Sequence, residues 1–148
     1  MTAHYILPNF DEASSSQIPA ILQLINMGYT YIPRHEVDAH RDGKNQYILR
    51  DIAHKAIRAI NPPEISDKSI DEALFALEKI KLDDGVVKAS EDVFSDLLGG
   101  RAVSEIIDGK RTSPQLKFID WKEPENNLFH VVAEFELEED QNRRPDIV

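Results

Sequence analysis

The sequence predicts an α+β fold in which N-terminal helices pack on a mainly antiparallel sheet formed by the last third of the chain. Apolar residues recur at helical spacing up to Gly100, and beyond it they alternate with polar residues as in strands. With 148 residues, of which 41% are hydrophobic, the chain is long enough for one domain with a core. We therefore expect a single domain, helical over 1–100 and strand-rich over 101–148.

The first helix is expected over 15–27. Ser14-x-x-Gln17 resembles a capping box, and Pro19 lies in the first turn, where its missing N–H is harmless. Gly28 then ends the helix. A short β-prone run at 29–32 follows, and a polar loop continues as far as Gly43.

Three further helices are expected over 46–60, 69–82 and 90–98. The second ends at Asn61-Pro62-Pro63, which cannot continue a helix. In the third, Ser69-x-x-Glu72 fits a reciprocal cap, and in the fourth, Ser90 fits an N-cap before an exit at Gly99-Gly100.

Strands are expected over 116–121, 128–137 and 145–148. Apolar and polar residues alternate along the second of these runs, which predicts one buried face and one solvated face. Pro124 to Asn127 supply turn chemistry between the first two strands. Trp121 and Phe135 are expected in the core of the sheet.

The charge of the chain argues against DNA binding by its surface as a whole. The formal net charge is −10, and residues 61–100 hold four Lys/Arg against ten Asp/Glu. Non-specific affinity for DNA comes mainly from cations that neutralise phosphates. One locally basic stretch is either a solvated loop or a phosphate contact. Its residues are Arg34, His35, His40, Arg41 and Lys44.

Several functional classes lack support in the sequence. The five histidines show no metal-ligand spacing, there is no cysteine, and no phosphate-binding glycine motif is present. Ser14-Ser15-Ser16 is better explained by helix capping than by nucleophilic catalysis. The chain has no cleavable signal and no apolar run long enough for a membrane span, so we expect a cytoplasmic protein without membrane contact.

The C-terminal residues Arg143 to Val148 carry the strongest functional signal. Pro145-Asp146 enters a short β-branched run, which is how many magnesium-dependent nucleases place their first metal-binding carboxylate on a sheet. A carboxylate is a natural Mg²⁺ ligand, but a site needs more than one such group. Glu134 and Glu136, on the neighbouring strand, are either a solvated face or a second metal carboxylate.

Four motifs, in this order, resemble the N-terminal region of the restriction (R) subunit of type I restriction-modification enzymes. They are Gly28-Tyr29-x-Tyr31-Ile32, Ile60-Asn61-Pro62, Ile119-Asp120-Trp121-x-x-Pro124-x-x-Asn127-x-Phe129-x-Val131-Val132-x-x-Phe135, and Arg143-Arg144-Pro145-Asp146-Ile147-Val148. No single motif is specific, but together they cover nearly the whole chain.

The resemblance implies a restriction-endonuclease-like PD-(D/E)xK nuclease domain, incomplete at its C-terminus. Asp146 matches the Asp of the family's first catalytic motif, and the Glu-x-Lys half of the site would follow beyond Val148. We therefore expect this chain alone to be inactive. A supporting metal carboxylate in the family's first helix has only Glu12 as a weak counterpart. Arg143 and Arg144, like Arg34, Arg41 and Lys44, are candidate DNA contacts.

The implied activity is that of a type I site-specific deoxyribonuclease. Mg²⁺ would serve DNA cleavage, and ATP would be used only by motor domains outside this chain. The implied partners are the DNA substrate and the modification (M) and specificity (S) subunits. Two alternatives stay open. The acidic segment 61–100 favours a non-catalytic protein-interaction module, and the net charge of the chain suggests an acidic DNA mimic.

Overall fold

The structure, a computed structural model, describes residues 16–79, 85–133 and 135. It divides into two compact units, one of Met1–Val37 with Phe129–Val148 and one of Asp38–Leu128. Helices and small sheets occur together, which confirms the α+β class. No helix in the described ranges has the length and apolar character that crossing a membrane requires.

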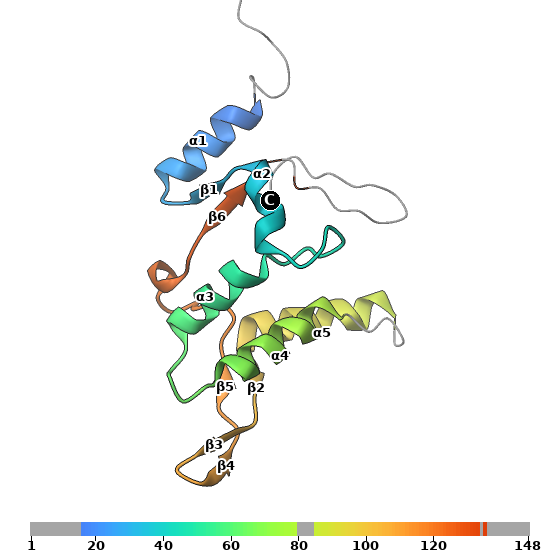
Figure 1. Ribbon diagram of the computed structural model, residues 1–148, viewed down its shortest axis with the longest axis vertical. Helices are drawn as coiled ribbons and strands as arrows, with labels where there is room; N and C mark the ends of the chain where they lie inside the picture. The colour runs from blue at the N-terminus through green and yellow to red at the C-terminus, as the bar shows by residue number, and fades with distance from the viewer. Residues whose placement is uncertain (1–15, 80–84, 134, 136–148) are drawn as a thin grey trace, which may run out of the picture. The chain divides into compact units, whose positions relative to one another are not determined.

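The first unit is built on two parallel strands. Strand β1 (Thr30–Ile32) pairs with β6 (His130–Val132) in the register Thr30↔His130. Helix α1 (Ile18–Asn26) contacts both strands, and the short helix α2 (Arg34–Val37) follows β1 (Figure 1). Among the described residues of this unit, the buried side chains are Ile32, Val37, Val131, Val132 and Phe135.

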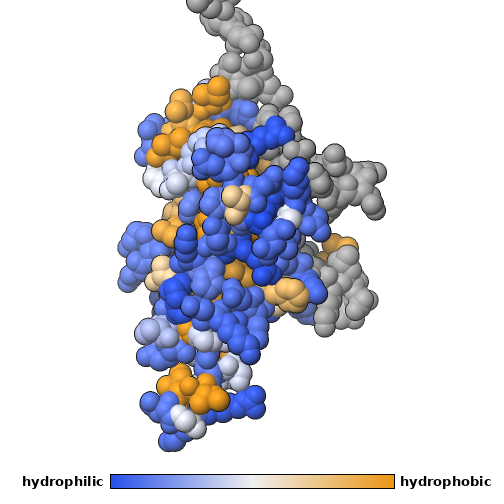
Figure 2. Space-filling view, in the orientation of Figure 1, coloured by the Kyte–Doolittle hydropathy of each residue, from blue (hydrophilic) through white to orange (hydrophobic). Residues whose placement is uncertain are grey.

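Helix α1 confirms the first predicted helix, and part of its apolar face is exposed. Pro19 is in the first turn, and Gly28 has a φ of +100°, as a helix exit requires. Ser14, the proposed cap, lies outside the described residues. Ile18, Leu22 and Ile25 are exposed, and Figure 2 shows this face as apolar surface where Figure 1 places α1.

The described residues of the second unit form three α-helices and two antiparallel strand pairs. The helices are α3 (Arg50–Ile60), α4 (Asp67–Glu78) and α5 (Val86–Gly99). Strand β2 (Arg101–Ala102) pairs with β5 (Gln115–Leu116), and β3 (Glu105–Ile107) pairs with β4 (Lys110–Thr112). Two 3-10 turns, η2 (Asp38–His40) and η3 (Pro124–Asn126), complete it.

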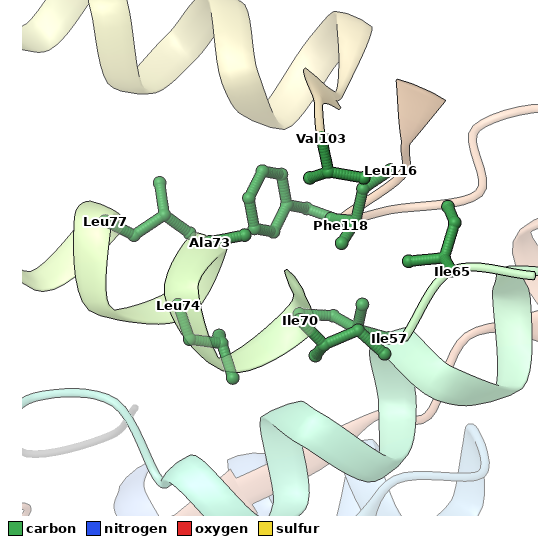
Figure 3. Close-up of a cluster of buried hydrophobic side chains, with 9 residues drawn as sticks. All are labelled: Ile57, Ile65, Ile70, Ala73, Leu74, Leu77, Val103, Leu116 and Phe118. Atoms are coloured by element: carbon green, nitrogen blue, oxygen red, sulfur yellow. The ribbon is translucent and has the colours of Figure 1, made fainter. Parts of the chain in front are cut away.

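One apolar cluster joins the elements of this unit (Figure 3). Helix α4 contributes the largest share, and α3 and the residues after α5 close the cluster. Fully buried aliphatic side chains of this kind each stabilise the fold by about 1.5–3 kcal/mol. The members are Ile57, Ile65, Ile70, Ala73, Leu74, Leu77, Val103, Leu116 and Phe118.

Two of the predicted helix caps are wrong. Ser66, not Ser69, caps α4, because the Ser66 hydroxyl accepts the hydrogen bond of the Ser69 N–H at 3.3 Å. Ser69 itself is buried in the first turn. Helix α5 begins at Val86 after Gly85, so Ser90 lies inside it. Helix α3 begins at Arg50, four residues later than predicted, and α2 with η2 occupies part of the predicted polar loop.

The predicted single sheet is also wrong within the described residues. Strand β5 ends at Leu116 and pairs with β2, whereas β6 pairs with β1 in parallel. The expected alternation fails too, since Val131 and Val132 are both buried. Trp121 is 57% exposed and is not a core residue, whereas Phe135, at 3% exposure, is.

Candidate functional site

The residues expected to carry the chemistry lie outside the described part of the chain. These are Asp146, Arg143, Arg144, Glu134, Glu136 and Glu12. Their roles stay predictions from the sequence. Within the described ranges, no group of three or more His, Asp or Glu side chains is arranged to hold a metal ion. What the structure does give is the scaffold around the motif residues and the placement of the basic stretch.

Arg41 stabilises the loop in which it lies. Its guanidinium donates to the Asp38 carboxylate at 2.6 and 2.9 Å, and to the backbone carbonyls of Lys44 and Gln46 at 3.2 and 3.1 Å. The Arg41 side chain is only 2% exposed. A buried and multiply bonded guanidinium is not available to a phosphate, so this geometry argues against the DNA contact expected for Arg41.

The other residues of the basic stretch lie at the surface or in a local ion pair. Arg34 and His35 are exposed on α2, and Lys44 is exposed in the loop. His40 Nδ1 lies 2.8 Å from the Asp51 carboxylate at the start of α3. Burial raises the pKa of Asp51, but hydrogen bonds from His40 and from the Ile52 N–H outweigh burial, so that this pKa lies below its ordinary value.

Asn61, of the second motif, connects the end of α3 to a distant backbone segment. Its side-chain amide donates to the carbonyls of Ile57 at 2.7 Å and Lys117 at 2.8 Å. Its side-chain oxygen accepts from the Lys117 N–H, also at 2.8 Å. Asn61 is buried, and it pairs with both backbone groups of Lys117 as a neighbouring strand would. This pairing explains why β5 stops before Lys117.

Asp120 and Asn127, of the third motif, fold the segment between them into a compact loop. The Asp120 carboxylate accepts from the backbone of Lys122 and Glu123 and from the Asn126 side chain. The Asn127 side chain accepts from the Asp120 N–H at 2.9 Å and donates to the Asp120 carbonyl at 2.9 Å. The Asn126 amide, followed by these backbone N–H groups, holds the pKa of Asp120 below its usual range.

Tyr29, of the first motif, helps to set the register of the parallel strands. Its ring lies 5.2 Å from the ring of Phe129, centroid to centroid. The Thr30 N–H donates to the Phe129 carbonyl at 2.9 Å, directly before the paired residues. Tyr29 and Phe129 thus support the pairing of β1 with β6, the strand that leads towards Pro145-Asp146 in the sequence.

A polar cluster that the sequence did not suggest lies between α3 and α4. Arg50 donates to Glu78 at 2.6 and 3.1 Å, and the Tyr47 hydroxyl donates to the Leu77 carbonyl at 2.7 Å. Burial, followed by the charge of Glu78, raises the pKa of Tyr47. The partners are 28 residues or more apart, so local sequence patterns carry no signal of this cluster.

Five of the eight acidic residues that the structure describes in segment 61–100 form ion pairs with Lys or Arg, three of them with cations outside the segment. Glu72 lies 3.6 Å from Lys68, Asp92 lies 2.7 Å from Lys88, and Asp96 pairs with Arg101. Asp67 lies 3.5 Å from Arg58, and Glu78 is held by Arg50. A mimic of DNA needs a field of unpaired negative charge. These pairs therefore argue against the DNA-mimic alternative.

The chain is an α+β protein in which the polar side chains of two motifs, Asn61 and the pair Asp120 and Asn127, hold backbone segments within one unit. A family model described as the type I restriction enzyme R protein N terminus matches residues 9–148. The chain belongs to this family, and the resemblance stated from its motifs is confirmed. No curated protein and no solved structure matches the chain.

Proposed function

We propose that residues 1–148 form the N-terminal part of a PD-(D/E)xK nuclease domain in the R protein of a type I restriction enzyme. The family match over 9–148 is the observation that carries the proposal. The second and third motifs support it, because the side chains of Asn61, Asp120 and Asn127 bind backbone groups and so have structural roles within their own unit.

Asp146 is the residue that we assign to the metal. Its carboxylate is an oxygen ligand of the kind that Mg²⁺ prefers, and it follows Pro145, which removes a backbone donor at the start of the run. When bound, Mg²⁺ would polarise a phosphate and lower the pKa of a bound water. Glu134 and Glu136 are the carboxylates in this sequence that we propose as additional ligands.

The substrate in this proposal is DNA, cleaved in an assembly with the modification and specificity subunits. ATP is used by motor domains, to which this chain contributes no nucleotide motif. Arg34 and Lys44 are exposed and are the described cations that we propose for DNA contact, together with Arg143 and Arg144. An assembly that acts on DNA in this way works in the cytoplasm.

Metal binding by the R protein tests the assignment without requiring activity. We would titrate Mn²⁺ without nucleotide and follow the free ion by electron paramagnetic resonance. Asp146→Asn should weaken the nuclease-site affinity about tenfold or more, because a neutral amide replaces a charged ligand. Asp140→Asn, a nearby matched change, should leave the affinity unaltered. Equal affinities for all three proteins would remove Asp146 from the metal site.

A further inference from the structure

Helix α5 carries a second apolar stripe that the fold leaves uncovered. Its buried face is formed by Ala89, with Val93 and Leu97 packed against the core cluster. Val87, Phe94 and Leu98 lie at a spacing of seven and four residues and so share another face of the helix. Their exposed fractions are 75%, 66% and 58%.

Trp121 extends this stripe at the C-terminal end of the helix. Its indole N–H donates to the Leu97 carbonyl at 2.9 Å, one of the carbonyls that a helix end leaves without an intrahelical partner. The loop behind it is fixed by Asp120 and Asn127, so the exposed ring is held in place before any partner arrives. Pre-ordered aromatic side chains of this kind are typical anchors of protein interfaces.

The charges around the stripe specify the partner. Glu91 lies on the stripe, one helical turn from both Val87 and Phe94, and Glu123 and Glu125 lie in the Trp121 loop. None of the three carboxylates has a cationic partner among the described residues. Lys122 is the one basic residue of that loop, so the rim is net negative.

We propose that Val87, Phe94, Leu98 and Trp121 form a docking surface for an amphipathic helix of a protein partner, whose apolar face is flanked by Lys or Arg. Val87, Phe94 and Leu98 recur at the i, i+7 and i+11 spacing of a helix face that packs side by side with the apolar face of a second helix. The acidic rim complements basic flanks and steers their approach. This interaction surface is independent of the metal site and goes beyond the proposed nuclease.

Trp121 is the sole tryptophan of the chain, so its fluorescence reports directly from the proposed surface. The probe is a synthetic helix of about 15 residues with leucines on one face and lysines beside them, long enough to be helical when bound. Titrated into the 148-residue chain, this probe should shift the Trp121 emission to shorter wavelength. Added salt should weaken the binding, because the rim charges are exposed.

Matched variants and a second probe decide the outcome. Leu98→Asp and Phe94→Asp should each weaken binding at least about tenfold. Ile106→Asp, at an apolar position on β3 that is also exposed, should not change it. Circular dichroism checks that all three fold. The proposal is overturned if the lysine helix leaves the emission unchanged, or if a glutamate-flanked helix binds as well. An emission shift that depends only on the chain's own concentration would assign the surface to self-association instead.

Discussion

Single polar residues fix the course of the backbone, and Asn61, which binds both backbone groups of Lys117, is the clearest case. Asn61→Ala would remove the partner of both the N–H and the carbonyl of Lys117, whose hydrogen bonds to Asn61 are part-buried. We expect a loss of about 1–3 kcal/mol in the free energy of unfolding, the usual cost of removing one partner from such hydrogen bonds. Urea unfolding measures it. Asn26→Ala, at the exposed end of α1, should cost no more than about 0.5 kcal/mol. Equal losses would contradict the bridging role.

We expect the loop held by Asp120 to lose stability in acid. Because its pKa is lowered in the folded state, the carboxylate stabilises the fold above the ordinary Asp pKa of about 4, and this stability is lost as the pH falls through the lowered value. Asp120→Asn should therefore flatten the decline of the melting temperature below about pH 4. Asp108→Asn, on the exposed β3–β4 turn, is the control. An unchanged acid profile for Asp120→Asn would show that this carboxylate contributes nothing.

The motif residues were visible in the sequence, but their roles were not. Asn61 and Lys117 are 56 residues apart, and nothing in local periodicity links them. The roles of the basic residues were not predictable either. The charge pattern alone does not distinguish Arg41, which is buried and paired, from Lys44, which is exposed. Trp121 was assigned to the core of the expected sheet as the end of a strand over 116–121, yet its indole N–H caps α5 and its ring stays exposed.

The ends of the helices depend on the backbone conformations that single residues can adopt, and two neighbouring glycines at the end of α5 illustrate this. Gly100 has φ +79° and ψ −179°, a conformation essentially restricted to glycine, and an added Cβ would meet the Leu116 carbonyl. Gly99 is helical and has open space around it. Gly100→Ala should thus destabilise the chain by about 2–4 kcal/mol, whereas Gly99→Ala should stabilise it by about 0.5–1 kcal/mol.

Thermal and urea unfolding of both glycine variants give the comparison. Changes of the same sign at the two positions would show that the α5–β2 junction is not formed as described.

The existence of α1, α3, α4 and α5 was predictable from apolar periodicity, and the exit at Gly100 from its residue type. The start of α4 was not, because Ser66 and Ser69 both fit a capping pattern, and Glu105, 39 residues away from Ser66, bonds to its N–H and hydroxyl.

At the scale of the whole molecule, the α+β class and the family were predictable, whereas the pairing of strands was not. The alternating run 128–137 was expected to pair with a strand close to it in the sequence. Instead β6 pairs with β1, which lies a hundred residues earlier, and Thr30 pairs with His130. Phe135 was correctly assigned to the core. Phe135→Ala should cost about 3–5 kcal/mol in unfolding free energy, and Phe94→Ala, at an exposed position, less than about 0.5 kcal/mol.

The central claim is that this chain supplies the first metal-binding carboxylate of a DNA-cleaving domain. The most direct measurement compares supercoiled-plasmid cleavage and ATP-driven translocation by the assembled restriction enzyme, with wild-type R protein and with Asp146→Ala. We predict that the variant loses cleavage and keeps translocation, because the carboxylate serves the metal and the motor lies in other domains. A well-folded Asp146→Ala enzyme that still cuts the plasmid at the wild-type rate would contradict the claim.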